Sequence, residues 1–171
     1  MKKFFCLIFI FMLSACTLKT TPYETMHLLE IRYTYNLSCN IKLSEIKVAD
    51  YLNTEKMVYR DAKGLHYFAL NKWACPFPYV IKQTLINSFP SLYQNQGKNL
   101  SIYILSFEPY FTNKKQGKIR LKAIVKLENS VKTFYIEHHF NAQNFEELMV
   151  HMNKTLDQFL KNLYFWIQAN C

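Results

Sequence analysis

Five histidines are the side chains in this sequence best suited to acid–base chemistry or metal binding, yet their spacing supports neither role. His138 and His139 are adjacent, so in a strand their side chains point to opposite faces and cannot bind one ion together. His138 shares its face with three apolar residues, Phe134, Ile136 and Phe140. The remaining histidines are isolated along the chain: His27, His66 and His151. We therefore interpret the histidines as structural, and we predict no catalytic residue and no metal ligand.

The composition also argues against nucleotide or nucleic-acid chemistry. The 171 residues include only three glycines, too few for a glycine-rich phosphate loop or a nucleophile elbow. The net charge is +9, but no run of basic residues exceeds two. This charge either favours anionic lipid, peptidoglycan or an acidic protein, or reflects lysines spread for solubility. We expect a protein that is not an enzyme, needs no cofactor and binds no nucleic acid.

The N-terminus has the pattern of an export signal. Lys2 and Lys3 precede an apolar run from Phe4 to Leu13, which is too short to span a bilayer. The sequence Ser14-Ala15-Cys16 follows directly and resembles the lipobox of bacterial lipoproteins. The alternative is an ordinary secretory signal with a chance cysteine after it. We predict that residues 1–15 are cleaved and that the thiol of Cys16 carries covalent lipid.

The lipoprotein resemblance implies a location. Residues 16–23 would be a lipidated tether, and two or three acyl chains would hold the chain stably on a membrane. Thr17, in place of an aspartate, favours the outer membrane over the inner one, with the protein facing the periplasm. The mature net charge falls from +9 to about +7, because Lys2 and Lys3 leave with the signal.

Three further cysteines, Cys39, Cys75 and Cys171, lie in the mature chain and lack metal-ligand spacing. Export permits disulfides. A Cys39–Cys75 bridge is one alternative, and buried free cysteines are the other. The odd count leaves one thiol unpaired in either case.

Hydrophobic periodicity predicts a single α+β domain over residues 24–171. Gly117–Glu128 is the clearest strand, because five apolar residues at every second position alternate with four basic ones: Lys118, Arg120, Lys122 and Lys126. A hairpin is expected to join Met57–Arg60 to Leu65–Leu70, with Gly64 in the turn. The other expected strands are Met26–Tyr35, Ile41–Val48, Leu100–Phe107 and Val131–Phe140.

Two helices complete the predicted fold. One begins near Pro78 and repeats apolar residues every four positions. The other is a long amphipathic C-terminal helix, capped by Asn144 with Glu147 three residues on, as in a capping box. We predict a mostly antiparallel sheet with a central helix, and the C-terminal helix packed on the sheet.

The most distinctive stretch runs from Met57 to Pro78. Without further information, its Trp73 would be a core residue between the hairpin and the following helix. The sequence nevertheless resembles, over nearly all of the mature chain, the ABC-transport auxiliary lipoproteins, whose best-known member type is PqiC. The residues that carry this resemblance are Tyr51, Leu52, Met57-Val58-Tyr59-Arg60, Tyr67, Asn71-Lys72-Trp73-Ala74, Pro76 and Trp166. The departures from the family pattern are Lys72, Cys75 and Phe77.

This resemblance implies a function. Such a protein would be a non-enzymatic auxiliary subunit of an ABC/MCE-type intermembrane lipid transport system. Its partners would be an MCE-domain protein and an ABC permease, and it could form a homo-oligomer. It would dock the periplasmic MCE component at the outer membrane. The alternative is an envelope assembly lipoprotein of the LPS-translocon type, which would bind a lipid or glycolipid itself.

Overall fold

The structure is a computed structural model that describes residues 23–94 and 96–171, and its largest part is a sheet of seven strands. The strands are β1 (Thr25–His27), β2 (Ile41–Val48), β3 (Lys56–Asp61), β4 (Gly64–Trp73), β5 (Lys98–Phe111), β6 (Gln116–Leu127) and β7 (Ser130–Asn141). The helices are α2 (Phe77–Ser88) and α3 (Phe145–Asn170), with short 3₁₀ turns η1 (Asp50–Leu52) and η2 (Pro90–Gln94). The predicted signal peptide, the anchor Cys16 and tether residues 16–22 lie outside the described residues.

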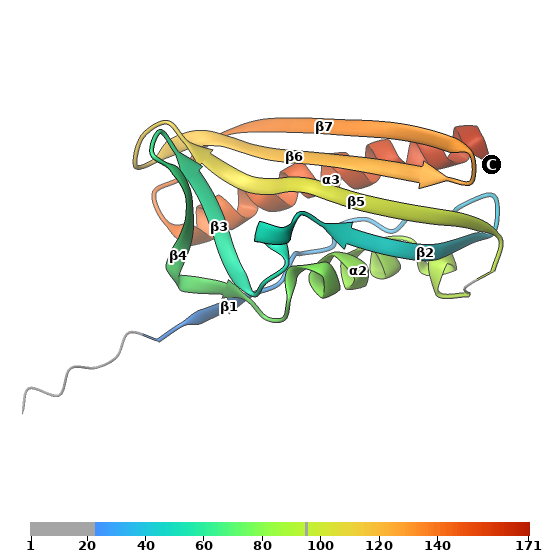
Figure 1. Ribbon diagram of the computed structural model, residues 1–171, viewed down its shortest axis with the longest axis horizontal. Helices are drawn as coiled ribbons and strands as arrows, with labels where there is room; N and C mark the ends of the chain where they lie inside the picture. Colours follow the sequence, from blue (N-terminus) through green and yellow to red (C-terminus); the bar gives the residue numbers. More distant parts are fainter. Residues whose placement is uncertain (1–22, 95) are drawn as a thin grey trace, which may run out of the picture.

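The sheet is mixed, so the prediction of a mostly antiparallel sheet is wrong. Its order is β1-β4-β3-β5-β6-β7, and β2 also pairs with β5. The pairs β3–β4, β5–β6 and β6–β7 are antiparallel, whereas β1–β4, β2–β5 and β3–β5 are parallel. The parallel pairs with β5 arise because β2 and β3 follow one another along the same edge of that strand (Figure 1). Alternation along a strand shows which residues share a face, but it does not fix the direction of the neighbouring strand.

The predicted strand Met26–Tyr35 is also wrong beyond its first residues, since β1 ends at His27. The chain that follows pairs with the helices instead of with the sheet. The backbone N–H of Tyr35 donates to Ser88 O of α2 at 2.7 Å, and that of Glu30 donates to the Asn153 side chain of α3 at 3.2 Å. The ring of Tyr35 also lies between those of Phe89 and Tyr164. This extended segment therefore has the apolar pattern of a strand, but it packs against the helices and does not pair with the sheet.

Both helices cover the same face of the sheet. Figure 1 shows α3 behind the sheet, and side chains of α2 and α3 meet residues of β5 and β6 in one small interior space. The inward residues of β6 are all buried: Ile119, Leu121, Ala123, Val125 and Leu127. The opposite face of β5, β6 and β7 carries the polar residues that alternate with them and has no helix over it. We call this uncovered side the open face.

The C-terminal helix begins as predicted. The side chain of Asn144 accepts a hydrogen bond from the backbone N–H of Glu147 at 2.9 Å. The carboxylate of Glu147 reaches back to the N–H of Gln143 at 2.8 Å, one residue earlier than in a standard capping box. The predicted hairpin is confirmed too, with β3 and β4 joined through a turn in which Gly64 has φ of +131°.

The disulfide joins Cys39 to Cys171, so the predicted alternative of a Cys39–Cys75 bridge is wrong. Cys39 lies just before β2, whose first residue pairs with Lys98 at the start of β5. The C-terminal end of α3 lies at the same place, because Lys98 Nζ donates to the carbonyls of Asn170 (2.8 Å) and Cys171 (2.7 Å). Cys75 follows β4 and is a free thiol. Topology brings together two cysteines that are 132 residues apart.

Candidate functional site

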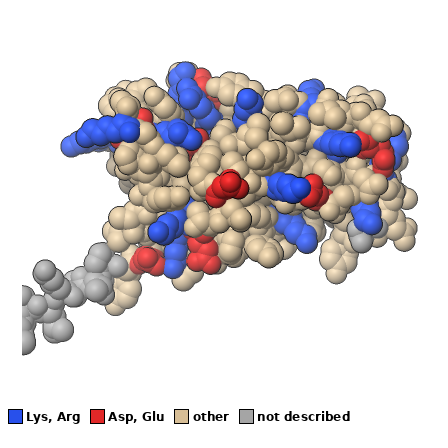
Figure 2. Space-filling view, viewed as in Figure 1, with Lys and Arg blue, Asp and Glu red and all other residues tan. Residues whose placement is uncertain are grey.

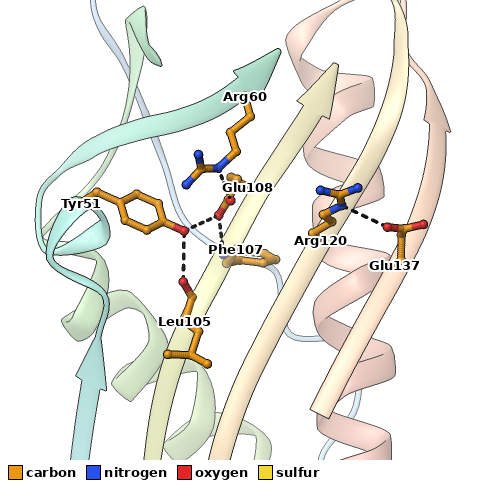
Figure 3. A network of polar contacts seen from close by, with 7 residues as sticks. All are labelled: Tyr51, Arg60, Leu105, Phe107, Glu108, Arg120 and Glu137. Carbon is orange, nitrogen blue, oxygen red and sulfur yellow. Dashed lines mark hydrogen bonds and ion pairs between the residues drawn. The ribbon is translucent and has the colours of Figure 1, made fainter. Parts of the chain in front are cut away.

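A row of alternating charges crosses four strands on the open face (Figure 3). It consists of Arg60 on β3, Glu108 on β5, Arg120 on β6 and Glu137 on β7, and we call it the charge row. The strand register aligns Glu108 with Arg120, and Arg120 with Glu137. Arg60 Nε lies 3.0 Å from Glu108 Oε1, and Arg120 Nε lies 3.0 Å from Glu137 Oε2. Opposite charges on neighbouring strands stabilise the sheet and fix one another in place.

Glu108 is the buried member of the row, with only 3% of its surface exposed. Besides Arg60, its carboxylate accepts hydrogen bonds from the Tyr51 hydroxyl and from the backbone N–H of Phe107, both at 2.9 Å. The Arg60 guanidinium also lies over the Tyr51 ring, 5.4 Å from its centroid. Burial, together with the adjacent Glu108 charge, raises the pKa of Tyr51 above its usual value, so its hydroxyl remains a donor. The buried charge is thus fully hydrogen-bonded.

Glu137 is the more accessible carboxylate of the row. It accepts hydrogen bonds from Lys118 Nζ at 2.7 Å, from the Tyr135 hydroxyl at 2.9 Å and from Arg120 Nε at 3.0 Å. Hydrogen bonds from Lys118 and Tyr135 are the main causes that lower the pKa of Glu137 to about 2. The Arg120 guanidinium lies 4.6 Å from the centre of the Tyr110 ring, a cation–π distance. These contacts hold Arg120 flat against the sheet.

Exposed residues surround the charge row on the same face: Tyr103, Lys122, Lys126, Val131 and Tyr135. Among the described residues, neither Lys122 nor Lys126 forms an ion pair. Figure 2, which looks onto this side, shows basic side chains interspersed with acidic ones and separated by broad uncharged areas. The open face is therefore a rigid surface that combines fixed charges, aromatic rings and two unpaired cations.

Of the residues that carry the family resemblance, Arg60 belongs to the charge row and Tyr51 donates a hydrogen bond to its Glu108. Tyr59 stacks on His66 inside the β3–β4 hairpin, and Tyr67 lies under Lys56 with 46% of its surface exposed. Three more are structural: Asn71 bonds His27 at 2.9 Å, Trp73 is buried against Phe77, and Pro76 is the residue that precedes α2. The predicted signature residues Tyr59, Arg60, Tyr67, Asn71, Trp73 and Pro76 therefore do not form one site.

The histidines behave only partly as expected. His139 is exposed and His138 points to the other face, so the predicted separation of this pair is confirmed. Sequence reasoning missed the contact of His138 with His151 of α3, whose Nε2 and Nδ1 atoms are 3.1 Å apart. Burial lowers the pKa of both rings, with neighbouring positive groups adding to the effect. Within residues 23–94 and 96–171, no three potential ligands gather around a metal position.

No helix in the described part of the chain is long and apolar enough to cross a bilayer. Both carboxylates of the charge row accept hydrogen bonds from several neighbouring groups, an arginine among them in each case. Their arrangement suits recognition of a charged partner surface.

The chain has relatives in sequence and in structure. A protein of Aquifex aeolicus (strain VF5), described as uncharacterized, is 32% identical over 164 residues, which cover 95% of this chain and 87% of that protein. The crystal structure of XCC0632 from Xanthomonas campestris, a DUF330 protein, gives a TM-score of 0.68 at 14% identity, over 85% of this chain and 95% of that one. A second crystal structure, of a protein described as uncharacterized, gives a TM-score of 0.63 at 14% identity, over 85% of this chain and 99% of that one. No family model matches the chain.

These comparisons correct the predicted family. The identification as a PqiC-like auxiliary lipoprotein is wrong, because the fold matches that of XCC0632, a DUF330 protein, and that of a protein described only as uncharacterized. At 14% identity the two structures establish the fold alone. The chain belongs to the same family as the Aquifex aeolicus protein, and its fold resembles that of the DUF330 protein XCC0632.

Proposed function

We propose that this protein is a membrane-anchored, non-enzymatic docking subunit of the bacterial envelope, which binds an acidic partner through its open face. The observation that carries the proposal is the charge row, whose side chains are held in place before any partner arrives. Charged groups that are already ordered lose little conformational entropy on binding. They also orient a partner of complementary charge.

The proposed location is the periplasmic side of the outer membrane. The lipobox-like sequence that ends at Cys16 supports lipidation, and Thr17 supports the outer membrane. The Cys39–Cys171 disulfide adds independent support, because such bridges persist mainly in oxidising compartments. A mature net charge of about +7 fits an acidic partner or an anionic membrane.

The partner class that we propose is a periplasm-spanning component of an intermembrane lipid transport system of the ABC/MCE type. A component that crosses the periplasm needs an attachment point at the far membrane. A small anchored domain with a rigid charged face supplies one without taking part in chemistry. Lys122 and Lys126 would meet acidic groups of the partner, with Tyr103 and Val131 supplying apolar contact.

Site-specific photo-crosslinking in living cells tests this proposal. A photo-reactive residue at Val131, which is 63% exposed on the open face, is compared with one at Tyr79, which is 64% exposed on α2. We expect the Val131 position alone to give a discrete crosslinked product, and mass spectrometry identifies the partner. Equal products from both positions, or none from Val131, contradict docking through the open face.

Charge reversal tests the consequence for the envelope. The variant Lys122→Glu/Lys126→Glu should lose the crosslink and raise envelope permeability to the level of a deletion strain. The matched control is Lys82→Glu/Lys161→Glu, which reverses two exposed lysines of the helix layer. If deletion of the whole protein leaves both the transport complex and envelope permeability unchanged, the proposed function is refuted.

A further inference from the structure

The described chain has a partly apolar groove at the end of the sheet where two hairpins meet. The β3–β4 turn and the turn between β5 and β6 border a space of about 560 Å³. Four aromatic residues line it, and three of them, Tyr59, Phe68 and Phe111, pack together as one wall. Two lysines, Lys63 and Lys114, also line the groove. Volumes of this size are typical of pockets that bind small molecules.

The aromatic wall of the groove is already formed. The Tyr59 ring lies 4.8 Å from that of Phe68 and 5.7 Å from that of Phe111. Phe68 is held from behind by Phe145 at the start of α3, with ring centres 5.0 Å apart. All three wall residues remain partly exposed. An apolar ligand would cover these exposed ring surfaces without any rearrangement of the fold.

The charges around the groove favour an anion. Asp61, the only acidic residue in its lining, already accepts a hydrogen bond from the backbone N–H of Lys63 at 2.7 Å and lies 3.0 Å from His66 Nε2. The side chains of Lys63 and Lys114 are exposed and make no ion pair within the described residues. Two free ammonium groups above an aromatic wall are complementary to an amphiphile with an anionic head.

The groove lies at the same end of the molecule as β1, from which the chain leads toward the predicted anchor (Figure 1). β1 pairs with β4, and Glu24 forms an ion pair with Lys72 at 2.6 Å. The residues of β4 just before this pairing, 67–69, line the groove. Cys16 is seven residues before Tyr23, which limits the reach of the tether to about 25 Å even when it is fully extended. Exposed apolar side chains occur on β1 and β4 at this end of the molecule: Met26, Tyr67 and Leu70.

We propose that the groove binds one acyl chain of an anionic phospholipid from the bilayer that holds the anchor. The chain packs on Tyr59, Phe68 and Phe111, and the phosphate lies between Lys63 and Lys114. This inference rests on the membrane anchor of the proposed function, but it does not depend on docking through the open face. The protein would then hold a single lipid at the membrane end of the molecule.

Photo-crosslinking from the lipid tests the site directly. The full chain, purified from envelopes, is reconstituted into vesicles that contain phosphatidylglycerol with a photo-reactive group in its acyl chain. We expect labelled peptides to map to residues 59–69 and 111–114. The variant Lys63→Glu/Lys114→Glu should lower this labelling at least about 30-fold, since loss of each lysine near an anionic surface removes about fivefold in binding and the new carboxylates add repulsion. Both lysines are exposed turn residues, so the variant should fold normally.

The control variant Lys122→Glu/Lys126→Glu changes the same number of charges on the open face and should leave the labelling unchanged. The inference is overturned if labelling spreads over the whole surface, if the groove variant labels like the native chain, or if a phosphatidylcholine probe labels the groove equally well. Intact mass of the purified chain reports acylation of Cys16 separately. An unlipidated chain refutes the anchor, whereas a lipidated chain with an unlabelled groove refutes this inference alone.

Discussion

Arg60→Met tests whether the charge row is held together by its buried carboxylate. Removing one partner of a fully buried ion pair costs about 3–5 kcal/mol, whereas exposed pairs are worth about 0.2–1 kcal/mol. Here the Glu108 side chain is 4% exposed, but that of Arg60 is 37% exposed, so water screens the pair from one side. Glu108 also keeps its hydrogen bonds from Tyr51 and from the backbone of Phe107. We therefore expect a loss of about 2 kcal/mol in the free energy of unfolding.

Urea unfolding with the disulfide intact measures this loss, and thermal unfolding should show a decrease of about 4–8 °C for a domain of this size. A double-mutant cycle with Glu108→Gln separates charge from packing, because Arg60 also lies over the Tyr51 ring. In the Glu108→Gln background, Arg60→Met should cost only about 0.5 kcal/mol. If Arg60→Met costs the same in both backgrounds, the guanidinium acts by packing on Tyr51 and the reasoning is refuted. Arg120→Met serves as the control, since its partner Glu137 is the more accessible carboxylate.

Three further perturbations probe other parts of the structure. Cys171→Ser removes a bridge that spans 132 residues and should cost about 2–4 kcal/mol in urea unfolding, a loss that reductant should reproduce in the native protein. The pKa of Glu137 is lowered to about 2, so its contribution to stability is complete above its ordinary pKa of 4.5 and disappears as the pH falls to 2. Glu137→Gln should therefore lower the melting temperature at pH 6 but not at pH 2. The pKa values of His138 and His151 are lowered from 6.5, so the unfolded chain binds more protons than the folded one and stability should fall as the pH drops below 6.5. His138→Phe, compared at pH 5 and 7.5, should reduce this fall in melting temperature. An unchanged pH dependence would show that the pair, on whose pKa values the charges of Lys154, Glu147 and His139 also act, does not govern the fall.

The sequence was sufficient to predict elements whose periodicity and local signals agree. β6 and β7 follow from strict alternation and a short turn, and α3 follows from the Asn144 cap and a sustained apolar stripe. The pairing of Arg120 with Glu137 is a consequence of that hairpin register, so it lay within reach of the sequence. These features depend on residues close together in the chain.

Features that depend on the order of the strands were not predictable in this way. The parallel pairing of β2 and β3 with β5, and the meeting of Cys39 with Cys171, require knowledge of which ends of the elements coincide. His138 and His151 come together because α3 lies across β7, a relation that no local spacing reports. The family resemblance misled for a related reason. Its residues follow one another along the chain in the order of the family pattern, but the fold gives them separate structural roles.

The position of Glu108 depends on an irregularity within a single strand. Leu100, Ile102 and Ile104 point into the core, and strict alternation would carry Glu108 inward with them and turn Phe107 to the open face. The register instead shifts between Ile104 and Ser106, so one extra residue, Leu105, exchanges the two faces. The carbonyl of Leu105 then lies 3.1 Å from the Tyr51 hydroxyl, the same group that contacts Glu108 at 2.9 Å (Figure 3). The bulge therefore places Glu108 in the charge row, where its buried carboxylate accepts the hydrogen bond from Tyr51. Because the apolar pattern changes phase at this point of the sequence, the bulge is the part of the site that periodicity alone could have revealed.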